Sequence, residues 1–322
     1  MQAALALSMR GHGRTAPNPN VGCVIVGDGV VIARGWTQPG GRPHAEAHAL
    51  DGCDASGADV YVTLEPCAHE SDRGPACADL LIEAGVARVA IAAADPDPRT
   101  SGKGVERLRA AGIEVVENVD AAGARRAMAG FFTRQAQGRP HVTLKLATSL
   151  DGQIAMADGS SQWITGEEAR AHAHVERSRA DIVIVGRGTA EADAPTLDVR
   201  LAGLAERTPK RAILTRDHSN FEKFTFKADQ PDWIHLASPE GVDELDAVDF
   251  ALVEGGASAA AAFLAADLVD RLVLYRAPIL IGSGMTALGD IGLGGLDDAH
   301  GQWRASEARM LGADRLEVFE RA

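Results

Sequence analysis

Three residues constrain the N-terminal half of the chain more than any other feature of the sequence. His44, Cys67 and Cys77 offer one imidazole and two thiols, which are ligands that zinc prefers. A fold that uses all three must bring three separate segments of the chain to one point. Three protein ligands leave the fourth zinc position open for water, as a catalytic zinc requires. The sequence therefore predicts a catalytic zinc site, with the acid Glu46 as its proton carrier.

The pattern around these residues resembles that of zinc-dependent deaminases, which combine H-x-E with P-C-x-x-C and use the Glu as general acid and base. The chain departs from this pattern, because nine residues instead of two separate Cys67 from Cys77. Two other ligand sets stay open. His48 lies four residues after His44 and could clamp a metal together with it, and His69 could be a fourth ligand that closes the site.

Composition narrows the class of protein further. A length of 322 residues predicts two domains, and no apolar run reaches the roughly 20 residues that a membrane span needs. The four cysteines are too few and too scattered for a disulfide framework, so reduced thiols and a cytoplasmic location are expected. The formal net charge of −13 argues against a nucleic-acid partner. The sequence leaves a homo-oligomer open.

Apolar runs and turn signals predict alternating strands and helices in the first half. Strands are expected at 21–26, 30–33, 60–64, 86–93 and 113–116, and helices at 1–9, 45–53, 78–84, 105–111 and 124–134. Asp28-Gly29 predicts a hairpin between the first two strands. Cys77 opens a helix, and a thiol at a helix N-terminus has a lowered pKa that favours the thiolate.

A polar segment rich in Gly and Pro at 135–140 predicts a domain boundary between residues 139 and 140. Strands are expected beyond it at 142–147, 181–185, 211–215, 233–236, 250–253 and 272–275. Thr165 and Glu168 match a capping box that starts a helix running to about residue 179. The Gly255-Gly256 turn precedes an Ala-rich helix at 259–266, whose first N–H groups could hold a phosphate. This turn does not match G-x-G-x-x-G, so an ordinary Rossmann domain is not expected.

Longer runs resemble one known family, the bifunctional riboflavin-biosynthesis deaminase/reductases. The similarity lies in segments 16–24, 43–46 and 62–69 of the first half, and in segments 145–152 and 161–165 of the second. It implies an α/β protein with an N-terminal cytidine-deaminase-like three-layer α/β/α domain, residues 1–139. A C-terminal dihydrofolate-reductase-like α/β domain is implied for residues 140–322. The chain departs from the family in the loop 68–76, where the family has a Gly-Arg-Thr-Pro-Pro run and one residue fewer.

The resemblance also implies two reactions and the residues that serve them. The first half is expected to use zinc to remove the ring amino group of a phosphoribosylaminopyrimidine, with Asn18 and Asn20 contacting this substrate. The second half is expected to reduce the ribosyl group to ribityl with NADPH. Implied cofactor contacts are Ala147, Trp163, Thr189, Asp193 and Gly256, and implied substrate contacts are Ser161, Arg177, Leu197, Arg200 and Glu254. Lys145 and Asp151 are expected beside the nicotinamide, and no proton donor follows from the sequence.

Arg177 and Arg200 would suit a phosphorylated substrate, because a guanidinium group binds phosphate bidentately. Two other functions remain open. One is a zinc-dependent tRNA adenosine deaminase with a C-terminal RNA-binding module, against which the acidic charge and the long spacing between the cysteines count. The other is a non-enzymatic protein held together by a closed zinc site, which requires His69 as a ligand.

Overall fold

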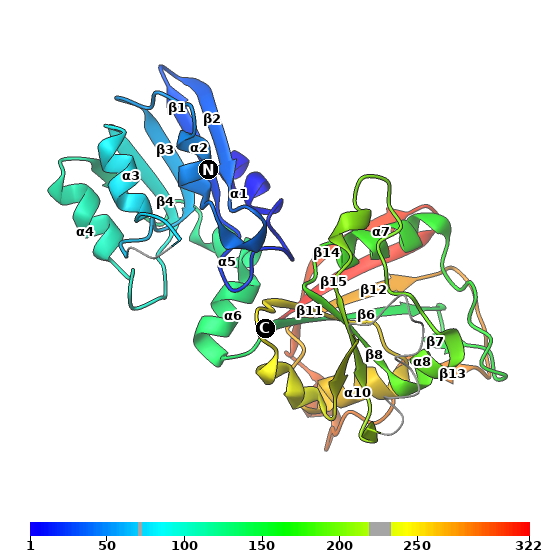
Figure 1. The fold of residues 1–322 in the computed structure, drawn as a ribbon. Helices are drawn as coiled ribbons and strands as arrows, with labels where there is room; N and C mark the ends of the chain where they lie inside the picture. Colours follow the sequence, from blue (N-terminus) through cyan, green and yellow to red (C-terminus); the bar gives the residue numbers. More distant parts are fainter. Residues whose placement is uncertain (70–72, 219–232) are drawn as a thin grey trace. The chain divides into compact units, whose positions relative to one another are not determined.

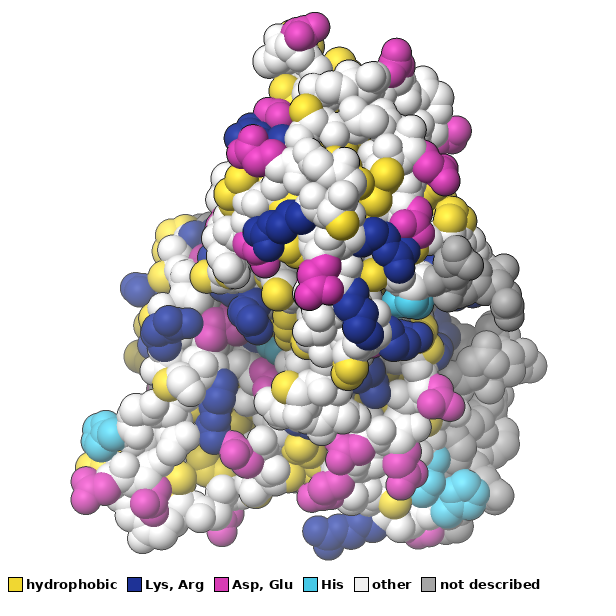
Figure 2. Space-filling model, turned by 90° about the vertical axis from the view of Figure 1, so that its left-hand side faces the viewer, with side chains coloured by type: hydrophobic (Ala, Val, Ile, Leu, Met, Phe, Trp, Pro, Cys, Tyr) yellow, Lys and Arg dark blue, Asp and Glu magenta, His cyan; other side chains and the backbone are white. Residues whose placement is uncertain are grey.

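The computed structural model describes residues 1–69, 73–218 and 233–322, which form two compact units, Met1–Gly138 and Arg139–Ala322 (Figure 1). Residues 70–72 of the atypical loop therefore lie outside the described part of the chain. Among the described residues, no helix is both long and apolar enough to cross a membrane. Figure 2 shows Lys and Arg side chains interspersed with Asp and Glu side chains on one face. On this face the acidic residues that give the chain its net charge of −13 therefore alternate with basic ones.

The first unit is built on a five-stranded sheet with the order β2-β1-β3-β4-β5. Its strands are β1 (Gly22–Gly27), β2 (Val30–Trp36), β3 (Asp59–Leu64), β4 (Arg88–Ala93) and β5 (Glu114–Val116). Strand β1 runs antiparallel to β2 and β3, whereas β3, β4 and β5 are parallel. The β1–β2 hairpin turns at Asp28 and Gly29, which both have positive φ, as the Asp-Gly pair predicts.

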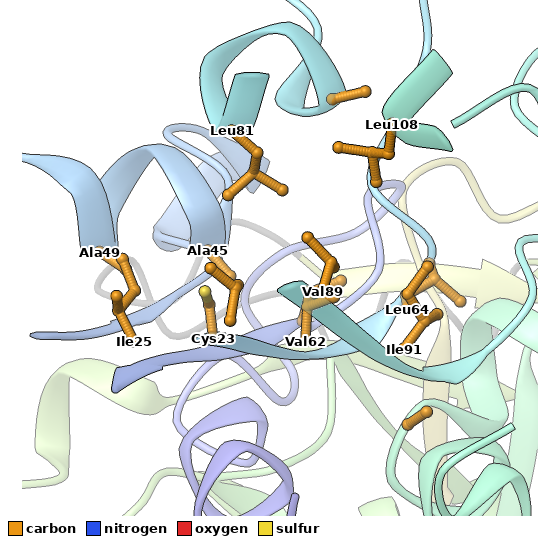
Figure 3. Close-up of a cluster of buried hydrophobic side chains, with 14 of the residues drawn as sticks. Cys23, Ile25, Ala45, Ala49, Val62, Leu64, Leu81, Val89, Ile91 and Leu108 are labelled. Carbon is orange, nitrogen blue, oxygen red and sulfur yellow. The ribbon is translucent and has the colours of Figure 1, made fainter. Parts of the chain in front are cut away.

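Helices cover both faces of this sheet, which confirms the three-layer α/β/α architecture. Helices α1 (Gln2–Ser8) and α5 (Ala121–Ala127) pack together on one face, and α2 (Ala45–Leu50), α3 (Cys77–Glu83) and α4 (Lys103–Ala110) lie on the other. Figure 3 shows the core under the second group, where Leu81 and Leu108 point toward Val62 and Val89. Side chains two positions apart on a strand share a face, so Cys23 and Ile25 join the same core.

The expectation of one helix over 124–134 is wrong. The chain forms two helices there, α5 and α6 (Ala129–Gln137), which are separated at Met128 by a non-helical φ of −116° and ψ of 28°. Met128 is fully buried and its sulfur accepts a hydrogen bond from the Thr63 hydroxyl. Tertiary burial of this one side chain therefore accompanies the break in a segment that is otherwise helical.

The second unit contains an eight-stranded sheet with the order β10-β9-β8-β11-β6-β12-β15-β14. Its strands are β6 (His141–Thr148), β8 (Ile182–Gly186), β9 (Lys210–Leu214), β10 (Trp233–Leu236), β11 (Phe250–Val253), β12 (Arg271–Arg276), β14 (Trp303–Leu311) and β15 (Asp314–Arg321). The strands from β10 to β12 are parallel, and β15 is antiparallel to β12 and β14. A two-stranded sheet pairs β7 (Gln153–Ala155) with β13 (Met285–Thr286).

Both faces of the central parallel strands are buried, as is usual for parallel sheets. In β8, Ile182 and Ile184 pack with Phe263 of α10 (Ala257–Ala265), while Val183 and Val185 pack with Ala190 of α8 (Arg187–Asp193). Short 3-10 helices complete the described chain at Pro39–Gly41, Ala205–Arg207, Pro239–Glu244 and Leu296–Ala299.

The capping box expected at Thr165 and Glu168 is wrong. Helix α7 (Glu167–Arg177) begins after Gly166, and no side chain of the helix start caps it. The Gly166 N–H donates instead to Asp314 Oδ2 at 2.6 Å. A carboxylate from the distant strand β15 thus replaces the local hydroxyl that the sequence pattern suggested.

Candidate active sites

The three expected zinc ligands come from three elements of the first unit. His44 is the N-cap residue of α2, Cys67 lies beyond the end of β3, and Cys77 is the first residue of α3. Their ligand atoms all lie within 4.8 Å of one another. His44 Nδ1 is 3.3 Å from Cys77 Sγ and 3.6 Å from Cys67 Sγ. The structure therefore brings one nitrogen and two sulfur donors together around one point.

The chemistry of this donor set fits zinc. The Cys77 N–H donates to Cys67 Sγ at 3.3 Å, which favours the thiolate that a metal needs. The hydrogen bond from the Cys77 thiol lowers the pKa of Cys67 to about 4. The same bond, with burial, raises the pKa of Cys77, so the lowered pKa expected at the start of this helix belongs to Cys67 instead. The two sulfur atoms share one proton, and a dication such as zinc would displace this proton and bind both sulfurs as thiolates.

Neither alternative ligand joins the cluster in the part of the chain that the structure describes. His48 Nδ1 lies 2.9 Å from Gln38 Nε2, and its ring packs edge-on against Trp36. His69 Nδ1 lies 3.3 Å from the Thr100 hydroxyl. Three ligands with an open fourth position are the arrangement of a catalytic zinc site.

Glu46 lies in the first turn of α2 and is 3% exposed. Burial raises the pKa of its carboxyl group, whereas the charge of His44 and a hydrogen bond with Cys77 lower it in part. The carboxyl group therefore lies against the ligand cluster without being one of the three donors. This is the placement that a general acid/base needs, because it must reach a water held at the open position.

Glu65 is a buried residue of this site that the sequence did not reveal. Its Oε1 accepts hydrogen bonds from the N–H groups of Gly104 (3.0 Å) and Val105 (3.2 Å) at the start of α4. Its Oε2 accepts from Gly102 (3.0 Å) and Asp95 (3.4 Å). A side chain at Gly104 would place its Cβ 2.1 Å from the Pro66 carbonyl oxygen, so this close approach requires glycine. The carboxylate thus fixes the turn that carries Cys67 against a helix N-terminus.

The two asparagines of the loop before β1 lie in different surroundings. Asn20 is buried, and its side-chain amide donates to the carbonyl oxygens of Ala127 (2.9 Å) and Ser8 (3.3 Å). This amide therefore ties the loop to the ends of α1 and α5. Asn18 is partly buried and packs against Gly41, where an added Cβ would come within 1.9 Å of Asn18 Nδ2. Substrate contact by either residue stays a prediction.

The second unit contains a cavity of about 1560 Å³ at the carboxyl ends of β6, β8, β9 and β11. Parallel α/β sheets bind their ligands at this edge. The cavity is lined by all ten residues for which the family resemblance implied cofactor or substrate contact in this half: Ala147, Ser161, Trp163, Arg177, Thr189, Asp193, Leu197, Arg200, Glu254 and Gly256. Their common location is a structural fact, while their individual roles stay predictions.

Three charged residues meet in the wall of this cavity. Arg177 binds Glu254 bidentately, with Nε–Oε1 at 2.5 Å and Nη2–Oε2 at 2.9 Å. Burial raises the pKa of Glu254, but the hydrogen bonds and charge of Arg177 outweigh it and lower this pKa. Lys145 Nζ lies 4.0 Å from Glu254 Oε2, and burial lowers the pKa of Lys145. Arg177 also donates to the Asp198 carbonyl oxygen (3.2 Å), and its side chain is 15% exposed. The Arg200 side chain lies 3.7 Å from Asp198 Oδ1 and is 62% exposed, so its guanidinium group has more access to solvent.

The start of α10 offers backbone N–H groups to the same cavity. Gly256 is its N-cap residue, no side chain caps it, and the Gly256 N–H donates to the Thr189 hydroxyl at 3.2 Å. At Gly255 a Cβ would lie 2.6 Å from the Ala259 Cβ, so the turn requires glycine. The first free N–H groups of this helix can therefore bind an anion such as a pyrophosphate.

Asp151 is not among the residues that line the cavity in the described structure, and its place beside the nicotinamide stays a prediction. Its carboxylate accepts hydrogen bonds from the Ser149 hydroxyl (2.5 Å) and the Gly282 N–H (2.7 Å). These bonds lower its pKa to about 2, and the bond from Ser149 contributes most. The residue holds two loops together. Trp163 is at the cavity wall, 66% exposed, with the Arg170 guanidinium 4.7 Å from its ring centre.

Comparisons with known proteins identify both halves. Residues 1–93 match the cytidine and deoxycytidylate deaminase zinc-binding region, and residues 140–314 match the RibD C-terminal domain. The riboflavin biosynthesis protein RibD of Escherichia coli is 39% identical, with 98% of this chain and 96% of that protein covered. RibD of Mycobacterium tuberculosis is 40% identical, over 98% of this chain and 95% of the relative.

Solved structures of the same family have the same fold over the whole chain. Acinetobacter baumannii RibD has a TM-score of 0.87 at 35% identity, covering 100% of this chain and 97% of that one. A diaminohydroxyphosphoribosylaminopyrimidine deaminase/5-amino-6-(5-phosphoribosylamino)uracil reductase from Thermotoga maritima has a TM-score of 0.86 at 33% identity, with the same coverage.

Proposed function

Because the chain belongs to the RibD family, and is a bifunctional deaminase and reductase of riboflavin biosynthesis that uses zinc and NADPH, we propose that each compact unit carries one of the two reactions. The zinc-dependent deamination belongs to residues 1–138, which contain His44, Cys67, Cys77 and Glu46. The NADPH-dependent reduction belongs to residues 139–322, which contain the large cavity.

The substrate proposed for the first unit is 2,5-diamino-6-(5-phosphoribosylamino)pyrimidin-4-one. The observation that carries this assignment is a three-donor cluster with an open position beside the buried acid Glu46. Zinc, when bound, lowers the pKa of water to about 7 and so makes a nucleophile available. Glu46 takes the proton that water loses on attack and gives it to the departing amino group, so that ammonia leaves. Glu65 keeps Cys67 in place during this reaction.

The substrate proposed for the second unit is the deaminated product, whose ribosyl group becomes ribityl. NADPH, when bound, would supply a hydride for C1′ of the ribosyl group. Opening of the ring at the bond from C1′ to the ring oxygen would then leave this oxygen in need of a proton. Lys145 is placed to give that proton, because it lines the cavity and its lowered pKa eases donation. Glu254 and Arg177 hold Lys145 in position, and Arg200 is the freer guanidinium for the 5-phosphate.

The proposal extends to the compartment and the partners. All four cysteines are free, and two of them must stay reduced to bind zinc, which suits the cytoplasm. The arginines that line the cavity, among them Arg177 and Arg200, suit an anionic small molecule. No observation on the described residues favours a tRNA substrate or a closed structural zinc site, and a homo-oligomer stays a prediction.

The proposal is tested by incubating the purified zinc protein with the diaminopyrimidinone substrate and NADPH. We expect one ammonia to be released per substrate before one NADPH is oxidised. Cys77→Ala should lose stoichiometric zinc and ammonia release, whereas Cys53→Ala, a partly buried thiol outside the cluster, should keep both. Oxidation of NADPH without earlier ammonia release, or zinc retained by Cys77→Ala, would contradict the assignment.

A further inference from the structure

The segment 194–200, which follows α8, supplies part of the cavity wall without forming a helix or a strand. It carries two of the expected substrate contacts, Leu197 and Arg200. Ala194 and Leu197 have φ angles of 39° and 51°, in the left-handed region that is unfavourable for residues other than glycine. Leu197 is nevertheless only 2% exposed. A segment in such a conformation persists only where the surrounding structure holds it.

Side chains from other parts of the second unit bind the backbone of this segment. Arg177 Nη1 donates to the Asp198 carbonyl oxygen at 3.2 Å. The Thr208 hydroxyl accepts a hydrogen bond from the Val199 N–H at 3.1 Å. The segment thus depends on side-chain contacts where a helix or a strand would use backbone ones.

His174 of α7 holds the residue at the end of the segment. Its Nδ1 accepts a hydrogen bond from the Arg200 N–H at 3.3 Å. His174 and Arg177 are three positions apart on the helix, so both face the same segment. His174 is half-buried and is not among the described residues that line the cavity. An effect of His174 on the substrate would therefore pass through Arg200.

The ion pair of the Arg200 side chain is weak. Its Nε lies 3.7 Å from Asp198 Oδ1, too far for a hydrogen bond, and the side chain is 62% exposed. Binding a phosphate costs entropy, because the arginine loses freedom of movement. This cost is smaller when the backbone of the arginine is already held in place.

We propose that His174 is a positioning residue of the reductase, which holds the backbone of Arg200 so that its guanidinium group meets the 5-phosphate of the substrate. This inference rests on the proposed reduction in the second unit. A neutral imidazole with its proton on Nε2 has the Nδ1 lone pair that this role requires. Burial, followed by the charges of Arg177 and Arg200, lowers the pKa of His174, and Glu254 opposes this in part. The neutral form is therefore favoured at neutral pH.

Steady-state kinetics of the full-length zinc protein with NADPH and the deaminated substrate test the inference. His174→Ala should raise the KM for this substrate roughly 2- to 10-fold, as expected for one hydrogen bond, and leave kcat and the KM for NADPH unchanged. The same substrate without its 5-phosphate should react with unchanged kcat/KM. His174→Asn should restore the KM, because Asn Oδ1 is as many bonds from Cα as His Nδ1 and also accepts a hydrogen bond.

A double variant tests whether His174 acts through Arg200. Arg200→Ala should raise the KM for the deaminated substrate by roughly 10- to 100-fold, and adding His174→Ala should raise it no further. His172→Ala is the matched control for a general loosening of α7. His172 is half-buried on the same helix, and its Nδ1 lies 2.7 Å from the Tyr275 hydroxyl, outside the cavity lining. This control should keep the KM of the wild-type protein.

Several results would overturn the inference. These are an unchanged KM in His174→Ala or Arg200→Ala, an equal loss with the substrate that lacks the phosphate, additive losses in the double variant, no recovery in His174→Asn, or an equal rise in His172→Ala. Failure of the reductase assignment itself is distinguishable, since the wild-type protein would then not oxidise NADPH with the deaminated substrate at all.

Discussion

Replacing Glu65 by Gln tests whether the hydrogen bonds of this buried carboxylate hold the turn that carries Cys67 in position. The side chain keeps its size but loses its charge, and one of its two oxygens becomes an NH₂ group. All four partners of Glu65 are backbone N–H donors, two to each oxygen. A Gln side chain can accept from only two of them, and its NH₂ group faces the other two.

The expected loss follows from this count. A hydrogen bond to a charged group contributes about 1.5–3 kcal/mol, so two lost bonds lower the free energy of unfolding of the first unit by about 3–6 kcal/mol. Cys67 lies two residues beyond Glu65, and groups that orient metal ligands typically change metal affinity by about 10- to 100-fold. The Gln variant should therefore also bind zinc more weakly by that factor.

Two measurements on the full chain check these values. Hydrogen exchange of the α4 peptide in increasing urea reports the unfolding of the first unit, and competition with a chelator reports zinc affinity. Glu106→Gln is the control, because Glu106 is exposed in the same helix and should change either quantity very little. A Glu65→Gln variant as stable and as tight for zinc as this control would refute the reasoning.

Three further predictions concern single side chains. Glu46→Gln should keep stoichiometric zinc but release ammonia roughly 10²- to 10⁴-fold more slowly, and normal release would move the proton transfer to another residue. Burial lowers the pKa of His141 to about 4, so the unfolded chain binds a proton first as the pH falls. The second unit should therefore lose on the order of 3 kcal/mol between pH 6.5 and 4, a loss that calorimetric melting should not find in His141→Phe. Arg177→Ala should abolish NADPH oxidation, because Glu254 loses its bidentate partner, and ammonia release should persist; equal loss of both rates would argue against this.

The zinc cluster was accessible from the sequence because its chemistry resides in residue types. An imidazole, two thiols and an adjacent acid predict a metal site and a proton carrier before any coordinates are known, and the structure brings the three donors together. The role of Glu65 was not accessible, since its partners lie 30 to 40 positions later in the chain. In the same way, the pairing of Arg177 with Glu254 joins residues 77 positions apart.

Some strands could be predicted from the sequence and others could not. Apolar runs such as 182–185 predict buried parallel strands, and the structure has them. Strand β14 was missed because it is exposed along almost its whole length and its sequence lacks an alternation of apolar and polar residues. Strand β15 was also missed, although Leu316 and Val318 are buried at alternate positions. The break at Met128 was missed for another reason, because it coincides with the tertiary burial of one side chain, which local helix propensity does not report.

The assignment of one reaction to each unit is tested most directly by removing zinc from the intact protein and assaying the two half-reactions separately. The proposed zinc ligands His44, Cys67 and Cys77 all lie in Met1–Gly138, whereas every proposed NADPH contact lies in Arg139–Ala322. Chelation should therefore abolish ammonia release from the diaminopyrimidinone and leave NADPH-dependent reduction of the deaminated substrate at its original rate. Loss of both reactions on chelation, in a chain that remains folded by circular dichroism, would contradict the account.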